Sequence, residues 1–129
     1  MSNNPIRVLF VDDNERLTAA WARLIAQQPD MRLAGTLHRA DDLLSAAQGG
    51  VDVVLIDLTM DGRDALDAIA ELSRVCPGVR TVVCSGQSRD PWEQRAKLAG
   101  AAEFVDKIEP PAAILETIRR VARPGRSPA

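Results

Sequence analysis

Two adjacent acids, Asp12 and Asp13, stand directly after the apolar run Ile6–Val11. Neighbouring carboxylates repel each other, so a folded protein must compensate the pair with a cation or with a helix N-terminus. Taken alone, the pair is more typical of a helix cap, because Asp12 and Glu15 have the spacing of a capping box. A bound metal ion is the other interpretation, and the remaining polar residues bear on the choice.

Three other polar residues also follow apolar runs: Asp57 in VVLIDLTM, Ser85 in VVCSG and Lys107 in FVDKI. Singly, each is typical of a turn or of a solvated surface. If the runs are parallel strands, however, their carboxyl ends lie at one edge of the sheet, where open α/β sheets bind ligands. This joint placement favours one functional site.

Carboxylates that are brought together raise one another's pKa values unless a cation compensates them. Mg²⁺ is the expected ion for Asp12, Asp13 and Asp57, because it takes oxygen ligands and few of them from protein. A carboxylate between a metal, the Lys107 ammonium and the Ser85 hydroxyl is a poor general base, but it is suited to accept a phosphoryl group. The sequence has no Walker glycine loop, so we expect the phosphoryl donor to be another protein or a small phosphodonor.

The elements that must position these residues are short apolar strands that alternate with helical segments. The expected strands are Ile6–Val11, Met31–Leu37, Val51–Ile56, Arg80–Cys84 and Glu103–Val105. The helical stripes are Leu17, Trp21, Leu24 and Ile25; Leu43, Leu44 and Ala47; Ala65, Ile69, Leu72 and Cys76; and Ile114, Leu115, Ile118 and Val121. A weaker helix is expected over Trp92–Ala99, after Pro91.

Strands separated by helices predict right-handed crossovers and a parallel sheet with helices on both faces. At this length the expected fold is an α/β, flavodoxin-like, doubly wound sheet of five strands in the order 2-1-3-4-5, with five helices. In that order the run Met31–Leu37 is an edge strand, far from the switch point. It is also the run that is followed by no comparable residue, which agrees with a site at the other four strand ends.

Size and composition indicate one globular domain. The chain has 129 residues, of which 46% are hydrophobic, and a formal net charge of −2. This charge offers no basic field for nucleic acid or an anionic membrane, so we expect no direct nucleic-acid or membrane binding. Cys76 and Cys84, in a predicted helix and a predicted strand, lack metal-ligand spacing and are expected to be reduced, buried thiols.

Residues 1–122 are expected to form the domain, and 123–129 a flexible tail or the start of a linker. The N-terminal MSNNPIR lacks the regions of a signal peptide, and no apolar run approaches the roughly 20 residues that span a bilayer. The cytoplasm is therefore the expected compartment.

The set formed by Asp12, Asp13, Asp57, Ser85 and Lys107 resembles the receiver (response-regulator) domain of bacterial two-component signalling, over nearly the whole chain. The resemblance implies that the acid pair holds Mg²⁺ and that Asp57 is phosphorylated from the phosphohistidine of a histidine kinase. It implies that Ser85 and Lys107 contact the phosphoryl group. Such a protein catalyses only its own phosphorylation and dephosphorylation, and is otherwise no enzyme.

The same resemblance implies further roles. A third protein ligand to the metal would be the main-chain carbonyl of Thr59. Phe104 occupies the place of an aromatic residue that changes rotamer together with the hydroxyl residue, and it lacks a phenol, so a switch there must act by packing. The implied partners are a sensor histidine kinase or phosphotransfer protein, and an output domain or protein that reads the face made by the fourth helix, fifth strand and fifth helix.

The sequence departs from the family pattern at three positions. Asp61 stands where proline is usual and adds negative charge near the site, and Ala65 stands where glycine is usual. Ile108 replaces the frequent proline after the lysine, a choice seen in receivers attached to helix-turn-helix output domains.

Two alternatives stay open. The chain could be a phosphate-independent binding module of the same fold, for which Asp61 and Phe104 leave room. It could also be a metal-dependent phosphohydrolase with an aspartate nucleophile, although those enzymes generally have Asp-x-Asp after the first strand, whereas Asn14 stands at the third position here.

Overall fold

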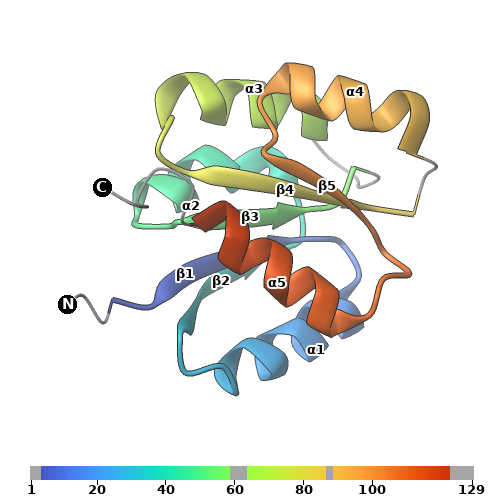
Figure 1. The fold of residues 1–129 in the computed structure, drawn as a ribbon. Coiled ribbons are helices and arrows are strands. Elements are labelled where there is room, and N and C mark those ends of the chain that lie inside the picture. Colours follow the sequence, from blue (N-terminus) through green and yellow to red (C-terminus); the bar gives the residue numbers. More distant parts are fainter. Residues whose placement is uncertain (1–3, 59–63, 87–88, 123–129) are drawn as a thin grey trace.

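A parallel sheet forms the middle layer of the computed structural model, which describes residues 4–58, 64–86 and 89–122. Its strands run side by side in the order β2-β1-β3-β4-β5, as the sequence predicts (Figure 1). The strands are β1 (Ile6–Val11), β2 (Met31–Leu37), β3 (Val53–Ile56), β4 (Arg80–Ser85) and β5 (Glu103–Asp106). Each neighbouring pair is parallel.

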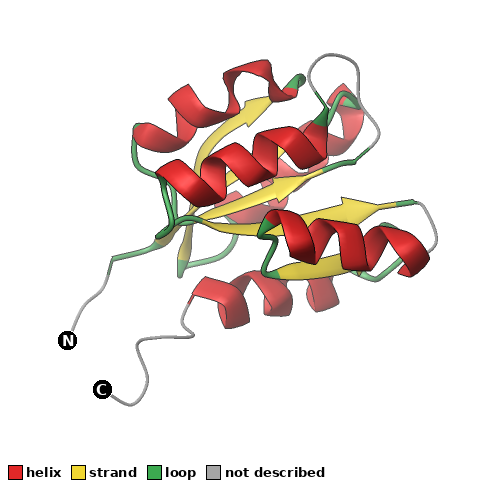
Figure 2. Ribbon diagram, turned by 90° about the horizontal axis from the view of Figure 1, so that it is seen from above, coloured by secondary structure: helices red, strands yellow, loops and turns green. Residues whose placement is uncertain are grey.

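Helices cover both faces of this sheet (Figure 2). They are α1 (Glu15–Ala26), α2 (Leu43–Gln48) after a short 3₁₀ turn (Ala40–Asp42), α3 (Ala65–Val75), α4 (Arg89–Ala99) and α5 (Pro111–Ala122). Helices α1 and α5 pack on one face, and α2, α3 and α4 on the other. The doubly wound α/β prediction is thereby confirmed.

The alternation of side chains along each strand divides the core into two clusters. Val8 and Phe10 of β1 face α1 and α5, whereas Leu9 and Val11 face the opposite helices. Phe10 stacks on Trp21 of α1, with ring centroids 5.4 Å apart. Strands covered on both faces need apolar residues at every position, which explains the nearly continuous apolar runs of the sequence.

Strands β4 and β5 each end one residue later than expected, at Ser85 and Asp106, and three other boundaries differ for local reasons. Strand β3 begins at Val53 rather than Val51, because the Asp52 carboxylate accepts the main-chain N–H of Arg7 at 2.9 Å just before the ladder starts. Cys76 was expected within the third helix but lies directly after it, since proline disfavours helical geometry in the residue before it. Helix α4 is interrupted at Asp90, so its regular turns begin at Pro91.

No helix among the described residues is long and apolar enough to cross a membrane. The expected tail over 123–129 lies outside the described part of the chain.

Candidate phosphoacceptor and metal site

The polar residues singled out above lie at the carboxyl ends of four strands. Asp12 follows β1 and Asp57 follows β3, while Ser85 is the last residue of β4 and Lys107 follows β5. Main-chain bonds to neighbouring strands hold these positions: the N–H of Asp12 donates to Leu37 and that of Asp57 donates to Val11, both at 2.9 Å. The register of the sheet therefore fixes the main-chain positions from which these side chains project.

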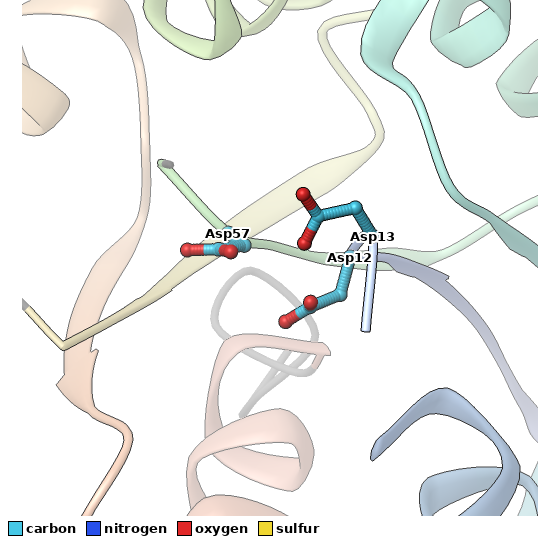
Figure 3. A group of neighbouring side chains, drawn as sticks. All are labelled: Asp12, Asp13 and Asp57. Carbon is cyan, nitrogen blue, oxygen red and sulfur yellow. The ribbon is translucent and has the colours of Figure 1, made fainter. Parts of the chain in front are cut away.

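The side chains of Asp12, Asp13 and Asp57 lie next to one another (Figure 3). One ligand oxygen from each of the three lies within 4.8 Å of the others. Asp12 and Asp57 are buried, with 8% and 5% of their surface exposed, whereas Asp13 is exposed. Among the described residues, Asp13 therefore brings the cluster into contact with solvent.

The alternative interpretation of Asp12 as a helix cap does not hold, because Asn14 is the residue that caps α1. Its side chain accepts the main-chain N–H of Leu17 at 3.1 Å. Asp12 instead accepts the N–H of Asn14 at 2.9 Å, a bond that orients its carboxylate within the turn before the helix. The acid pair is thus free of the capping task that the sequence pattern suggested.

The Lys107 ammonium bridges the two buried acids. Its Nζ lies 2.9 Å from an Asp12 oxygen and 3.3 Å from an Asp57 oxygen. Burial lowers the pKa of Lys107, but its hydrogen bonds and charge interactions with Asp12 and Asp57 raise that pKa more, so the net shift is upward. The ammonium is therefore charged at neutral pH and offsets part of the negative charge of the cluster.

Ser85 and Phe104 are both buried, at 0% and 1% exposure. Ser85 pairs in register with Asp106, and its carbonyl accepts the N–H of Lys107 at 3.0 Å, so the ends of β4 and β5 are joined beside the site. Phe104 packs in the core cluster under α2, α3 and α4. Thr59 and Asp61, which the sequence placed at the site, lie outside the described residues.

The donor set fits a hard divalent cation. Three carboxylates supply oxygen ligands, two of them from buried positions, and the third is exposed, so water molecules can complete the shell that Mg²⁺ keeps. Net negative charge remains after Lys107 is counted, which favours a divalent cation over a second ammonium.

The structure adds residues that the sequence analysis missed, in the turn that carries Lys107. Asp106 accepts the N–H of Ile108 at 3.0 Å, and Glu109 accepts the N–H of Asp106 at 3.1 Å. The spacing of two acids around a lysine, in DKIE, was the available signal, because acids three residues apart often bind main-chain N–H groups in turns.

Comparison with known proteins agrees with this geometry. Residues 8–119 match the family model of the response regulator receiver domain. The chain belongs to this family. Receiver domains of two-component signalling accept phosphoryl groups, so the function expected from the sequence is confirmed at the level of the family.

Relatives of this receiver domain are found over most of its length. The response regulator GacA of Pseudomonas aeruginosa is 32% identical over 117 residues, which are 90% of this chain and 55% of the relative. The response regulator UvrY of Escherichia coli is 28% identical over 117 residues, which are 90% of this chain and 54% of the relative. The receiver domain thus spans about half the length of the curated relatives it matches.

The fold has close counterparts among solved structures. A signal receiver domain from Mycobacterium tuberculosis, assigned to the response regulator NarL, superposes with a TM-score of 0.88 at 20% identity. The match covers 94% of this chain and 98% of that one. At this identity the likeness supports the fold alone.

Proposed function

We propose that Asp57 is the phosphoacceptor of this receiver domain, with Mg²⁺ held by Asp12, Asp13 and Asp57. One observation carries the proposal: the Asp57 carboxylate is buried within reach of both the acid pair and the Lys107 ammonium. Phosphoryl transfer spreads negative charge over the phosphoryl oxygens, so the accepting carboxylate needs cationic partners beside it. Asp57 has the Lys107 ammonium on one side and, on the other, the acid pair that would hold the metal. The main-chain carbonyl of Thr59 completes the proposed protein ligands.

The chemistry requires only this chain and a donor. An oxygen of the Asp57 carboxylate forms a bond to phosphorus as the bond between phosphorus and the donor breaks, and the donor group leaves with that electron pair. Bound Mg²⁺ would neutralise charge on the phosphoryl oxygens. Lys107 binds a phosphoryl oxygen through its ammonium, and Ser85 donates its hydroxyl hydrogen to another. The domain catalyses only its own phosphorylation and dephosphorylation.

The proposed phosphoryl donor is a histidine kinase or phosphotransfer protein, and the proposed compartment is the cytoplasm. An output domain or partner protein would bind the face made by α4, β5 and α5 and respond to phosphorylation. Two observations support a linked output. This chain matches only about half the length of its curated relatives, and Ile108 stands after the lysine, as in receivers that carry helix-turn-helix domains. Phosphorylation would draw Ser85 toward the new charge and repack Phe104, a local charge change that biases a two-state element.

The test is phosphorylation by acetyl phosphate with and without Mg²⁺, followed by intact-mass measurement. Wild type should gain one phosphoryl group, and the gain should be lost with Asp57→Asn or with excess EDTA. Asp64→Asn, which changes a cap residue of α3, is the matched control and should still be phosphorylated. Equal phosphorylation of Asp57→Asn and wild type would refute the proposal, and no phosphorylation of either would favour the phosphate-independent binding module.

A further inference from the structure

The turn that carries Lys107 is held by two carboxylates that take no part in the proposed metal seat. Asp106 and Glu109 flank Lys107 and Ile108, and the main-chain N–H of Glu109 donates to the carbonyl of Asp106 at 3.0 Å. This is the closing bond of a β-turn with Lys107 at its second position. Ile108 is 86% exposed, so apolar packing of its side chain does not fix the turn.

Side-chain bonds lock this turn from both ends. The Asp106 carboxylate accepts the N–H of Ile108 at 3.0 Å, and the Glu109 carboxylate accepts the N–H of Asp106 at 3.1 Å. The main-chain N–H of Lys107 itself donates to Ser85, which ties the turn to the end of β4. Main-chain N–H groups are therefore bound before, at and after Lys107.

A lysine side chain is a flexible four-carbon stem, so its ammonium is placed only as well as its main chain. Here that ammonium lies at hydrogen-bonding distance from two carboxylates that follow different strands, 2.9 Å from Asp12 and 3.3 Å from Asp57. Phosphoryl transfer depends on groups that are already placed when charge develops. Loss of the turn would leave Lys107 present but poorly placed.

We propose that Glu109, together with Asp106, is a positioning residue for phosphorylation, because it holds the turn that presents the Lys107 ammonium to Asp12 and Asp57. The inference rests on the proposed function of Asp57. Glu109 acts through Lys107 and need not touch the phosphoryl group. Its role follows from its acceptor oxygen, so glutamine should replace it and alanine should not.

A positioning role has two measurable consequences of opposite sign. Glu109→Ala should lower the rate constant of phosphorylation by acetyl phosphate at saturating Mg²⁺ by about 10-fold. It should also tighten Mg²⁺ binding by about threefold, because the Lys107 ammonium competes with the metal for the Asp12 carboxylate. General damage to the fold would weaken both phosphorylation and Mg²⁺ binding.

The experiment measures both quantities, with Mg²⁺ affinity from calorimetric titration, for wild type, Glu109→Ala, Glu109→Gln and Glu116→Ala. Glu116 is an exposed acid on α5 that pairs with Arg119, so its replacement is the matched control. Glu109→Gln and Glu116→Ala should stay within about twofold of wild type, since both retain the acceptor at the turn. If glutamine behaves like alanine, charge rather than the hydrogen bond is responsible and the proposal is wrong.

A double-mutant cycle separates this proposal from the one on Asp57. In a Lys107→Ala background, Glu109→Ala should have little further effect on the phosphorylation rate or on Mg²⁺ affinity, because there is no ammonium left to place. An undiminished effect in that background would overturn the positioning role. Failure of wild type to take up phosphate on Asp57 would instead overturn the proposed function. Urea unfolding of each variant identifies any that fail to fold.

Discussion

Lys107 supplies the positive charge that offsets part of the negative charge of the site. Two of the three clustered carboxylates lie within hydrogen-bonding distance of its ammonium, and their combined effect on its pKa exceeds the opposing effect of burial. Because the pKa of Lys107 lies above the ordinary lysine value of 10.5, its ammonium stays charged from acidic pH to a pH above that value. Phosphorylation should therefore show no pH dependence from Lys107 near neutrality.

Replacement of Lys107 by alanine should slow phosphorylation by about 100-fold, because one preorganised charge at the transferring group is removed. Mg²⁺ should bind more tightly to the same variant. Lys97→Ala removes an exposed lysine that pairs with Glu93 on α4, and it should leave both quantities unchanged. The readouts are single-turnover phosphorylation and Mg²⁺ titration, and weaker Mg²⁺ binding by Lys107→Ala would contradict this account.

The two cysteines differ in burial, and their chemistry should differ accordingly. Burial raises the pKa of the Cys84 thiol to about 12, whereas Cys76 is partly exposed. Thiolate is the reactive form, so a raised pKa means that reaction keeps accelerating as pH rises and reaches no plateau near pH 9. We expect Cys76→Ser to be labelled slowly by a thiol reagent at pH 7, with a rate that still increases at pH 10. A plateau below pH 10 would contradict the burial of Cys84.

At the scale of elements, local sequence rules identify the residues that could cap a helix. They do not decide which of several neighbouring candidates does so. Asp12 and Asn14 are both suitable cap residues, and Asp12 also has Glu15 at the right distance. The structure selects Asn14, because the main-chain N–H of Asp12 is engaged by β2 and extends strand pairing past β1. That tertiary bond is invisible in the sequence, so local pattern alone could not decide against the capping-box spacing of Asp12 and Glu15.

Asn14→Ala should lower the free energy of unfolding by about 1 kcal/mol, the usual effect of removing an N-cap acceptor. Asn14→Asp keeps an acceptor for the N–H of Leu17 and should cost much less. Urea denaturation measures both. Equal destabilisation by the two variants would show that the side-chain bond is not what begins α1.

The structure also requires a glycine after α4. Gly100 has a φ of +115°, and a Cβ there would collide with Ser73 of α3. Gly100→Ala should therefore destabilise the domain by about 2 kcal/mol, through backbone strain and the clash. Gly78→Ala meets no atom within 4 Å and serves as the control in thermal unfolding. Equal melting temperatures for the two variants would argue against this tight packing of α3 and α4.

At the scale of the whole molecule, the strand order explains why sequence reasoning could find the site. Hydrophobic runs and breakers indicated the alternation of strands and helices, and the order 2-1-3-4-5 then brings Asp12, Asp57 and Lys107 to one edge. Contacts between surface residues far apart in the sequence leave no comparable hydrophobic or breaker pattern, so they could not be predicted. Arg119 on α5 binds Asp30 at 2.7 Å and Gln28 at 2.8 Å, in the turn between α1 and β2, across about 90 positions of sequence.

This Arg119 contact ties α5 to the turn that follows α1 on the same face, and its removal should loosen that attachment. Arg119→Ala should lower the free energy of unfolding by about 1 kcal/mol, a modest value because both partners are partly exposed. The double variant Arg119→Ala, Asp30→Ala should lose less than the sum of the single variants. Strict additivity in urea unfolding would show that the pair contributes nothing.

If Asp57 itself carries the phosphoryl group, chemical mapping of the phosphorylated residue will show it. Wild-type protein is treated with acetyl phosphate and Mg²⁺, reduced with borohydride, which converts an aspartyl phosphate to homoserine, and digested for peptide mass analysis. Homoserine at position 57 and at no other acid is the predicted result. Homoserine at Asp12 or Asp13, with Asp57 intact, would contradict the assignment of acceptor and metal ligands at this site.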